Sequence, residues 1–116
     1  MFKKEKSQRQ KRVSELIRQI ASDFINTETN KTSLITVTHV DVAPNLSQAV
    51  LFVTVFPESA EESALNFLKR KRSEIKHAVK KNTKMKRIPF FDFEIDQGEK
   101  NHQKIEEISI KSRSKK

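Results

Sequence analysis

The chain opens with an amphipathic segment, followed by two segments rich in β-branched residues. Between residues 13 and 25 the apolar side chains recur at spacings of three and four, which predicts a helix that buries one stripe. Leu34–Val42 and Gln48–Phe56 follow as predicted strands, and Pro44 favours a tight turn between them. The first half of the chain therefore predicts a helix packed against an antiparallel hairpin.

The second and third predicted strands differ in how their apolar residues are placed. Gln48–Phe56 is apolar on both faces, which favours a central position in a sheet. The third strand begins at Ile88 and Pro89, and Phe91 and Phe93 then alternate with acidic residues, which indicates one buried and one wet face. Proline at its start suits an edge strand, because proline has no N–H to donate to a neighbouring strand.

A helical pattern fills the interval between the second and third strands. Ser59 and Glu62 have the spacing of a capping box, in which the two residues satisfy free backbone N–H groups at a helix start. Apolar residues are absent from residues 69–74 and resume at Ile75. One straight helix would leave that interval without contact to a core. The sequence therefore predicts two helices, or one sharply kinked helix, meeting near residues 71–73, and both a kink and a loop are compatible with the pattern.

The predicted order is helix, strand, strand, helix, helix, strand. The helix pair supplies the right-handed crossover that joins two parallel strands, and the helices then cover one face of a three-stranded sheet. This order resembles the topology of type II KH domains, which bind nucleic acid. The expected fold class is α+β, with a single KH-like domain at residues 12–98, a basic lead-in at residues 1–11 and a polar, basic, largely flexible tail at residues 99–116.

Composition narrows the class of protein. A chain of 116 residues has room for one domain. Without cysteine it has neither a disulfide framework nor a thiolate metal site. No apolar run has the length of a membrane span, and no signal-peptide hydrophobic region follows the charged start. These features predict a soluble, cytoplasmic protein, and the isoelectric point of about 9.9 fits a partner such as nucleic acid or an anionic membrane surface.

Positive charge is concentrated in residues 68–89, which we call the basic segment. It holds ten Lys and Arg residues and one acidic residue, Glu74, so its balance equals the formal net charge of +9 for the whole chain. Like charges on neighbouring helical turns repel one another, and contact with a polyanion would reverse the sign of that energy and release condensed counterions. Nucleic acid is the leading predicted partner, and a solvated helix face is the simpler alternative.

Several motifs resemble those of the ribosome-binding factor A family, a bacterial KH-like family of small-subunit maturation. The resemblance runs from about residue 12 to residue 108, and the shared order and spacing of its motifs make it specific. The motifs are Arg12-Val13 with Glu15-Leu16-Ile17 in the first helix, residues 35–46 in the hairpin, residues 49–53 in the second strand, Arg87-Ile88-Pro89 with Phe91, Phe93 and Asp96 in the third strand, and residues 104–108 at the close.

The chain departs from the family pattern at the helix junction. KH domains place a Gly-x-x-Gly loop between their central helices, where bare backbone can clamp phosphates, but Gly98 is the sole glycine here. The family has an Ala-x-Gly kink at this junction, and the matching residues are Lys71, Arg72 and Ser73. We therefore expect a kinked helix pair in place of the Gly-x-x-Gly loop, with the Ser73 hydroxyl as a group that can assist the bend.

The resemblance implies an RNA-binding ribosome assembly factor. Such a factor would bind the free small ribosomal subunit and assist late maturation and processing of its ribosomal RNA, without catalysis, cofactor or metal, as a cytoplasmic monomer away from membranes. Its cations would position RNA rather than read bases. The residues assigned to RNA binding are Lys69, Arg70, Lys71, Arg72, Ser73, Lys76, Lys80, Lys81, Lys84, Lys86 and Arg87, and Lys111, Arg113, Lys115 and Lys116 in the tail would add a flexible contact.

Other candidate groups favour structural roles. Spacing assigns four phenylalanines to the core and leaves Phe90 open as a base-stacking side chain. The histidines lack the spacing of metal ligands, and the acidic residues of the third strand lack catalytic partners and predict a solvated face. The core phenylalanines are Phe24, Phe52, Phe91 and Phe93; the histidines are His39, His77 and His102; and the acidic residues of the third strand are Asp92, Glu94 and Asp96.

Three function classes follow from these observations. The first is the assembly factor, and the second is a generic KH-like RNA-binding or RNA-chaperone protein that acts off the ribosome. Co-sedimentation with free small subunits separates the two. The third is a peripheral protein held to anionic membrane, which the sequence disfavours because the basic segment lacks the aromatic and leucine face of an interfacial helix.

Overall fold

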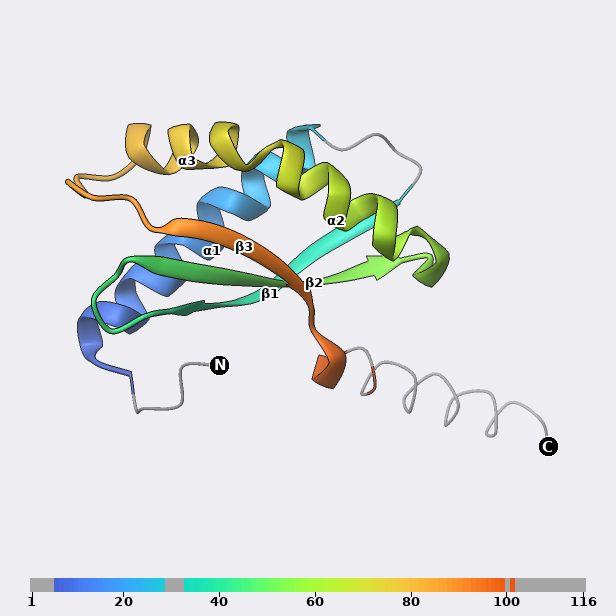
Figure 1. Cartoon of the computed structure of the whole chain (residues 1–116), viewed down its shortest axis with the longest axis horizontal. Helices are drawn as coiled ribbons and strands as arrows, with labels where there is room; N and C mark the ends of the chain where they lie inside the picture. The colour runs from blue at the N-terminus through green and yellow to red at the C-terminus, as the bar shows by residue number, and fades with distance from the viewer. Residues whose placement is uncertain (1–5, 29–32, 100, 102–116) are drawn as a thin grey trace.

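The computed structural model describes residues 6–28, 33–99 and 101 of the chain. It contains the predicted order of helices and strands, with one short 3-10 helix added before the second helix (Figure 1). The predicted α+β class and element order are confirmed. The elements are α1 (Gln8–Glu28), β1 (Leu34–Val42), β2 (Gln48–Phe56), η1 (Glu58–Ala60), α2 (Glu61–Arg70), α3 (Arg72–Lys81) and β3 (Phe90–Ile95).

The sheet has the order β1-β2-β3. β1 and β2 are antiparallel, whereas β2 and β3 are parallel and are joined through the α2–α3 pair. β2 is therefore the central strand, as its two apolar faces predicted, and β3 lies at an edge immediately after Pro89. The chain thus returns across one face of the sheet, which places the basic segment on the crossover.

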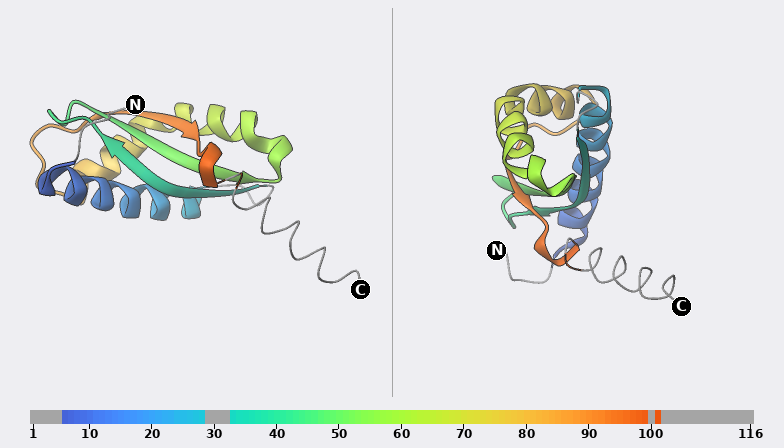
Figure 2. Two further views of the ribbon diagram at one scale, coloured as in Figure 1. Left: turned by 90° about the horizontal axis from the view of Figure 1, so that it is seen from below. Right: turned by 90° about the vertical axis from the view of Figure 1, so that its right-hand side faces the viewer.

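The helices cover one face of this sheet. α1 packs against β1, α2 and α3 pack along β3, and α1 and α3 touch each other (Figure 2). Alternate residues of β2, such as Leu51 and Val53, are fully buried on the covered face. In β1 the alternation changes phase where the register shifts between Val37 and His39, so that a bulge keeps Val40 on the buried side.

The core joins all three helices to the covered face of the sheet. α1 contributes Ile17, whereas Leu68 and Ile75 anchor α2 and α3, and all three are completely buried. Phe91 and Phe93 belong to this core as predicted, and Phe24 is partly buried against it.

The assignment of Phe52 to the core is wrong. Phe52 lies on the uncovered face of the sheet, where its ring stacks on that of His39 with centroids 4.4 Å apart. β2 is apolar on both faces, so periodicity alone does not tell which phenylalanine points inward.

The helix starts show where a capping motif forms. Ser7 and Gln10 make a capping box at the start of α1: the Gln10 N–H donates to Ser7 Oγ over 3.2 Å, and the Ser7 N–H donates to Gln10 Oε1 over 2.9 Å. The buried Gln10 side chain also donates from Nε2 to the Val42 carbonyl over 2.9 Å. This box starts α1 earlier than the apolar stripe that begins at Val13.

The predicted capping box of Ser59 and Glu62 is absent from the start of α2. Ser59 lies inside η1, and the residue before α2 is Ala60, which makes no side-chain cap. The Ala60 N–H donates to the Pro57 carbonyl over 3.0 Å, and the Glu61 N–H donates to the Glu58 carbonyl. The 3-10 turn satisfies these N–H groups with backbone carbonyls, so the serine side chain is not needed there.

Candidate nucleic-acid interface

The basic segment forms the second half of the crossover, from the end of α2 through α3 to the loop before β3 (Figure 1). Most of the residues assigned to RNA binding are exposed, but the two at the helix junction are half-buried. The exposed members are Lys69, Arg70, Ser73, Lys76, Lys80, Lys81, Lys84, Lys86 and Arg87, and the half-buried ones are Lys71 and Arg72.

The junction between α2 and α3 is a kink of one residue. Lys71 alone separates the helices, with φ −90° and ψ 4°. Its N–H is shared between the carbonyls of Phe67 and Leu68, at 3.0 and 3.1 Å, and its own carbonyl accepts from the Ile75 N–H at 2.9 Å. Backbone hydrogen bonds therefore continue through the bend, and Ser73 lies beyond it as an exposed residue of α3. A kink, not a loop, replaces the Gly-x-x-Gly segment.

The two cations at this kink have partners within the fold. Lys71 Nζ lies 3.1 Å from Glu74 Oε2. The Arg72 guanidinium lies 4.6 Å from the centroid of the Phe90 ring and 3.7 Å from Asp92 Oδ1. Phe90, 54% exposed on the uncovered face, is thus occupied by a cation–π contact with Arg72. Arg72 therefore links the crossover to β3, whereas Lys71 is paired within the crossover itself.

The cations of α3 lie on two flanks of the helix. Lys76 and Lys80 are four residues apart and share one flank. Lys81 lines a groove between α1 and α3 together with Glu74 and His77. Among the described residues, neither Lys76 nor Lys80 forms an ion pair with an acidic group. The flank of Lys76 and Lys80 is accordingly the more open to a polyanion.

The last cations of the basic segment line a second feature, which we call the end groove. It has a volume of about 600 Å³ and lies where the first turns of α1, the β1–β2 turn and the loop before β3 meet. Its cations are all exposed, and none of the described residues that line it is acidic. The lining consists of Arg9, Lys84, Lys86 and Arg87, of Val13, Leu16, Leu46 and Met85, and of Pro44, Asn45 and Thr83.

Arg9 was missed by the sequence reasoning. It falls in the segment assigned to a basic lead-in, whereas the structure places it in the second residue of α1. A signal was present, because Arg9, Val13 and Leu16 are spaced by four and three and therefore share a helix face. Nothing in that spacing indicated that the face would meet the loop of Lys84 and Arg87.

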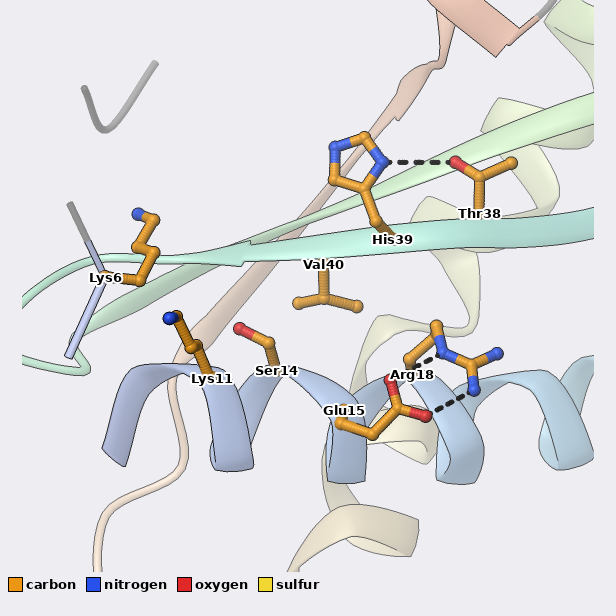
Figure 3. A pocket seen from close by; sticks show the side chains of 8 residues that line it. All are labelled: Lys6, Lys11, Ser14, Glu15, Arg18, Thr38, His39 and Val40. Atoms are coloured by element: carbon orange, nitrogen blue, oxygen red, sulfur yellow. Dashed lines mark hydrogen bonds and ion pairs between the residues drawn. The ribbon is translucent and has the colours of Figure 1, made fainter. Parts of the chain in front are cut away.

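A groove between α1 and β1 contrasts with the end groove, because Lys6, Glu15 and Arg18 in its lining form ion pairs (Figure 3). Lys6 lies 2.5 Å from Asp41 Oδ1 and donates to the Val42 carbonyl. Arg18 donates from Nε to Glu15 Oε2 over 3.0 Å, and this hydrogen bond lowers the pKa of Glu15. Such internal pairs leave less charge for a polyanion.

A polar cluster on the uncovered face joins β1 to the end of β3. The Thr38 hydroxyl donates to Asp96 Oδ2 over 2.6 Å, and His39 Nδ1 lies 3.2 Å from the same oxygen. Burial opposes ionisation of Asp96, but hydrogen bonds from the Glu99 N–H and Thr38, together with His39, outweigh it and lower the pKa of Asp96.

The prediction of a solvated acidic face on the third strand is therefore wrong for Asp96, whose side chain is 14% exposed. Glu94 alone of the three carboxylates is fully on the surface, since Asp92 is half-buried next to Arg72. A period-two pattern places these residues on one face but does not tell which neighbours cover them.

The described part of the chain holds neither a membrane-spanning helix nor a cluster of metal ligands. None of its helices combines the length and the apolar character needed to cross a membrane. No three histidine or acidic side chains within residues 6–28, 33–99 and 101 are grouped so as to hold a metal ion. His102, the closing motif at residues 104–108 and the cations Lys111, Arg113, Lys115 and Lys116 lie outside the described residues.

The sequence is similar to that of a known protein family. A family model described as ribosome-binding factor A matches residues 9–109. Ribosome-binding factor A of Ruegeria sp. (strain TM1040) is 36% identical over 97 residues, which are 78% of this chain and 73% of that protein.

Solved structures show the same fold. The crystal structure of ribosome-binding factor A from Thermus thermophilus matches with a TM-score of 0.68 at 23% identity, over 74% of this chain and 93% of that chain. A homology model of the Thermus thermophilus factor, fitted into a cryo-EM map of its complex with 30S, matches with a TM-score of 0.62 at 24% identity, over 70% of this chain and 88% of that chain. These matches confirm the KH-like fold.

Proposed function

The chain belongs to the ribosome-binding factor A family, and on that premise we propose that it binds the free small ribosomal subunit and assists late maturation and processing of the subunit's ribosomal RNA. The proposal is carried by one observation, the row of exposed cations along the crossover on a fold whose Thermus thermophilus counterpart was fitted into a complex with 30S. Neutralising RNA phosphates would turn the mutual repulsion of these cations into a favourable contact.

The contact surface of this proposal is the outer side of α3 with the loop that follows it. Lys76 and Lys80 project from one flank without an acidic partner among the described residues, and Lys84 and Lys86 continue the exposed charge beyond the helix. Lysine side chains of this kind are point charges, which position a phosphate backbone and carry little base specificity. Selectivity for the small subunit would come from the shape of the RNA that this surface fits.

The role is non-catalytic, carried out by a monomer in the cytoplasm. Two acidic residues of the third predicted strand support the non-catalytic role, because Asp92 lies next to Arg72 and Asp96 accepts from Thr38, so both carboxylates have structural partners. Charges that hold RNA in a productive arrangement can assist its maturation without any reacting side chain.

Sedimentation tests the proposal. The purified protein is centrifuged with free small subunits, large subunits and whole ribosomes over a salt series, beside the double variant Lys76→Glu/Lys80→Glu. A control with the same change of charge, Lys11→Glu/Arg12→Glu, alters exposed residues of α1 instead. We expect the wild type and the control to sediment with free small subunits selectively, and the α3 variant to lose that binding.

One outcome would contradict the selectivity for the small subunit, and another would contradict the assigned contact surface. Equal binding of the wild type to every RNA-bearing particle would reduce the protein to a generic KH-like RNA binder. Selective binding by the α3 variant at wild-type strength would remove the flank of Lys76 and Lys80 from the contact.

A further inference from the structure

The end groove has the charge of a phosphate site. Arg9 reaches it from α1, and Lys84, Lys86 and Arg87 reach it from the loop before β3, so cations from distant parts of the sequence meet at one place. The groove between α1 and α3 includes Glu74, and the groove between α1 and β1 includes Glu15. None of the described residues that line the end groove is acidic, so an anion there meets attraction without a competing carboxylate from this lining.

The same groove offers apolar surface next to the cations. Leu16 is 36% exposed in it, and Met85 is partly buried against the core beside it. Phosphate alone gains nothing from such side chains, whereas a nucleotide brings both an anionic phosphate and a flat base. In duplex RNA the bases are stacked and paired, but in a single strand an unstacked base can leave the backbone and contact side chains.

The wall of the groove that belongs to the β1–β2 turn is held in place before any ligand arrives. The Leu46 N–H donates to the Ala43 carbonyl over 2.8 Å, and Asn45 Oδ1 accepts from the N–H and the hydroxyl of Ser47. Leu46 has φ 60°, in the left-handed region that leucine rarely adopts. Such backbone persists only where the surroundings hold it, and a preformed wall lowers the entropy lost on binding.

We propose that the end groove binds an unstacked nucleotide of single-stranded RNA, with the phosphate among the cations and the base against Leu16 and Met85. The proposal rests on the proposed function and deepens it. The flank of Lys76 and Lys80 follows an RNA backbone, and the end groove receives a single strand from the same particle. A volume of about 600 Å³ is in the range of sites that hold small organic ligands.

The charge part of the proposal is tested by fluorescence anisotropy with a labelled oligouridylate, over a salt series. Arg9→Glu is compared with Arg12→Glu, which changes the same charge on the same helix at an exposed residue outside the groove lining. A glutamate in the first turn favours a helix start, so lost binding in Arg9→Glu would not come from a weakened α1.

We expect Arg9→Glu to weaken oligouridylate binding by about tenfold and to lower the slope of log affinity against log salt by about 0.7, the value for one phosphate contact on a single strand. Arg12→Glu should stay within about twofold of the wild type. Equal losses in the two variants would overturn the proposal, since binding would then follow net charge alone.

The apolar part is tested with a second matched pair. Leu16→Asn should weaken oligouridylate binding while leaving the salt slope unchanged, whereas Leu34→Asn, at the opposite end of β1 and 64% exposed, should change neither. A duplex of the same length should bind more weakly than the single strand. Tight duplex binding, or displacement of the oligouridylate by oligoglutamate as readily as by unlabelled RNA, would overturn the nucleotide site.

Sedimentation of the same variants separates this inference from the proposed function. If Arg9→Glu and Arg12→Glu bind the oligouridylate equally while the wild type still selects free small subunits, the groove inference fails and the proposed function stands. If the wild type shows no selectivity for small subunits but keeps the Arg9-dependent binding of a single strand, the proposed function fails and the groove remains an RNA site.

Discussion

The α2–α3 junction and the end groove both draw cations from the basic segment, but the fold uses those cations differently. At the junction, Lys71 and Arg72 are half-buried and lie against acidic and aromatic partners. In the end groove the cations are exposed, and its lining within residues 6–28, 33–99 and 101 includes no acidic residue. A cation with an internal partner must give up that contact before it meets a phosphate. Charge density along a sequence therefore does not rank residues by their availability to a ligand.

The largest expected difference between the two regions is in stability. Ile75→Ala empties a completely buried position beside the kink and should lower the free energy of unfolding by about 2–5 kcal/mol. Leu16→Ala in the end groove should cost less than about 1 kcal/mol, because Leu16 is already 36% exposed. Urea unfolding followed by circular dichroism measures both, and equal losses would mean that the groove is as much a part of the core as the junction.

A smaller loss of stability should show whether the shape of the Arg72 side chain matters at the junction in addition to its charge. Arg72→Lys keeps the charge but loses the planar group over Phe90, and should lower the free energy of unfolding by about 0.5–1 kcal/mol. Arg87→Lys in the end groove should leave stability unchanged. Urea midpoints of the two variants decide the question, and a stability loss in Arg87→Lys that matches Arg72→Lys would contradict a structural role confined to the junction.

The two regions should also differ in how acid affects stability, because carboxylates have structural partners at β3, whereas the described lining of the end groove holds none. Hydrogen bonds give Asp96 a folded pKa below its ordinary 3.8. The stabilisation is therefore complete above the unfolded pKa and is lost as the pH falls below about 3.8 and through the lowered folded value. The urea concentration at the midpoint of unfolding, measured as a function of pH, should fall in acid for the wild type and for Arg9→Gln. In Asp96→Asn this fall should be smaller. If Asp96→Asn loses as much stability in acid as the wild type, Asp96 is not the source of that loss.

The smallest expected effect is at the kink residue. Lys71→Ala removes the pair with Glu74, which is exposed enough to contribute little, and the change in the free energy of unfolding should stay within about 0.5 kcal/mol. Thermal unfolding against the wild type measures this. A loss of several times that size would show that the Lys71 side chain, and not only the buried residues on either side, holds the bend.

The position of the kink was predictable because burial of apolar surface is the dominant favourable term in folding. Leu68 and Ile75 flank a stretch without apolar residues, and both are fully buried. That the junction is one residue long was not predictable, since the shared N–H of Lys71 depends on how closely the two helices approach. Nor did the Ser73 hydroxyl have to assist, because backbone hydrogen bonds continue through the bend.

Two identical motif spacings had different outcomes. Ser7 and Gln10 form a capping box, whereas Ser59 and Glu62 do not. Gln10 is also held by the Val42 carbonyl, which belongs to a strand far along the chain. At Ser59 the chain leaves β2 through Pro57 and closes a 3-10 turn that supplies backbone acceptors. A local motif predicts a possible cap, and the path of the chain into the helix decides whether it forms.

The sequence by itself determined the order of helices and strands, the central place of β2 and the region of positive charge, because periodicity and net charge are local properties of the chain. The tertiary structure decided that Asp96 is enclosed, that Phe52 faces away from the core, and that Arg9 joins the last cations of the basic segment. Each of these depends on which distant residues become neighbours. Such neighbours are set by packing of the whole fold, since a side chain's environment in a dense interior is made by segments remote in sequence.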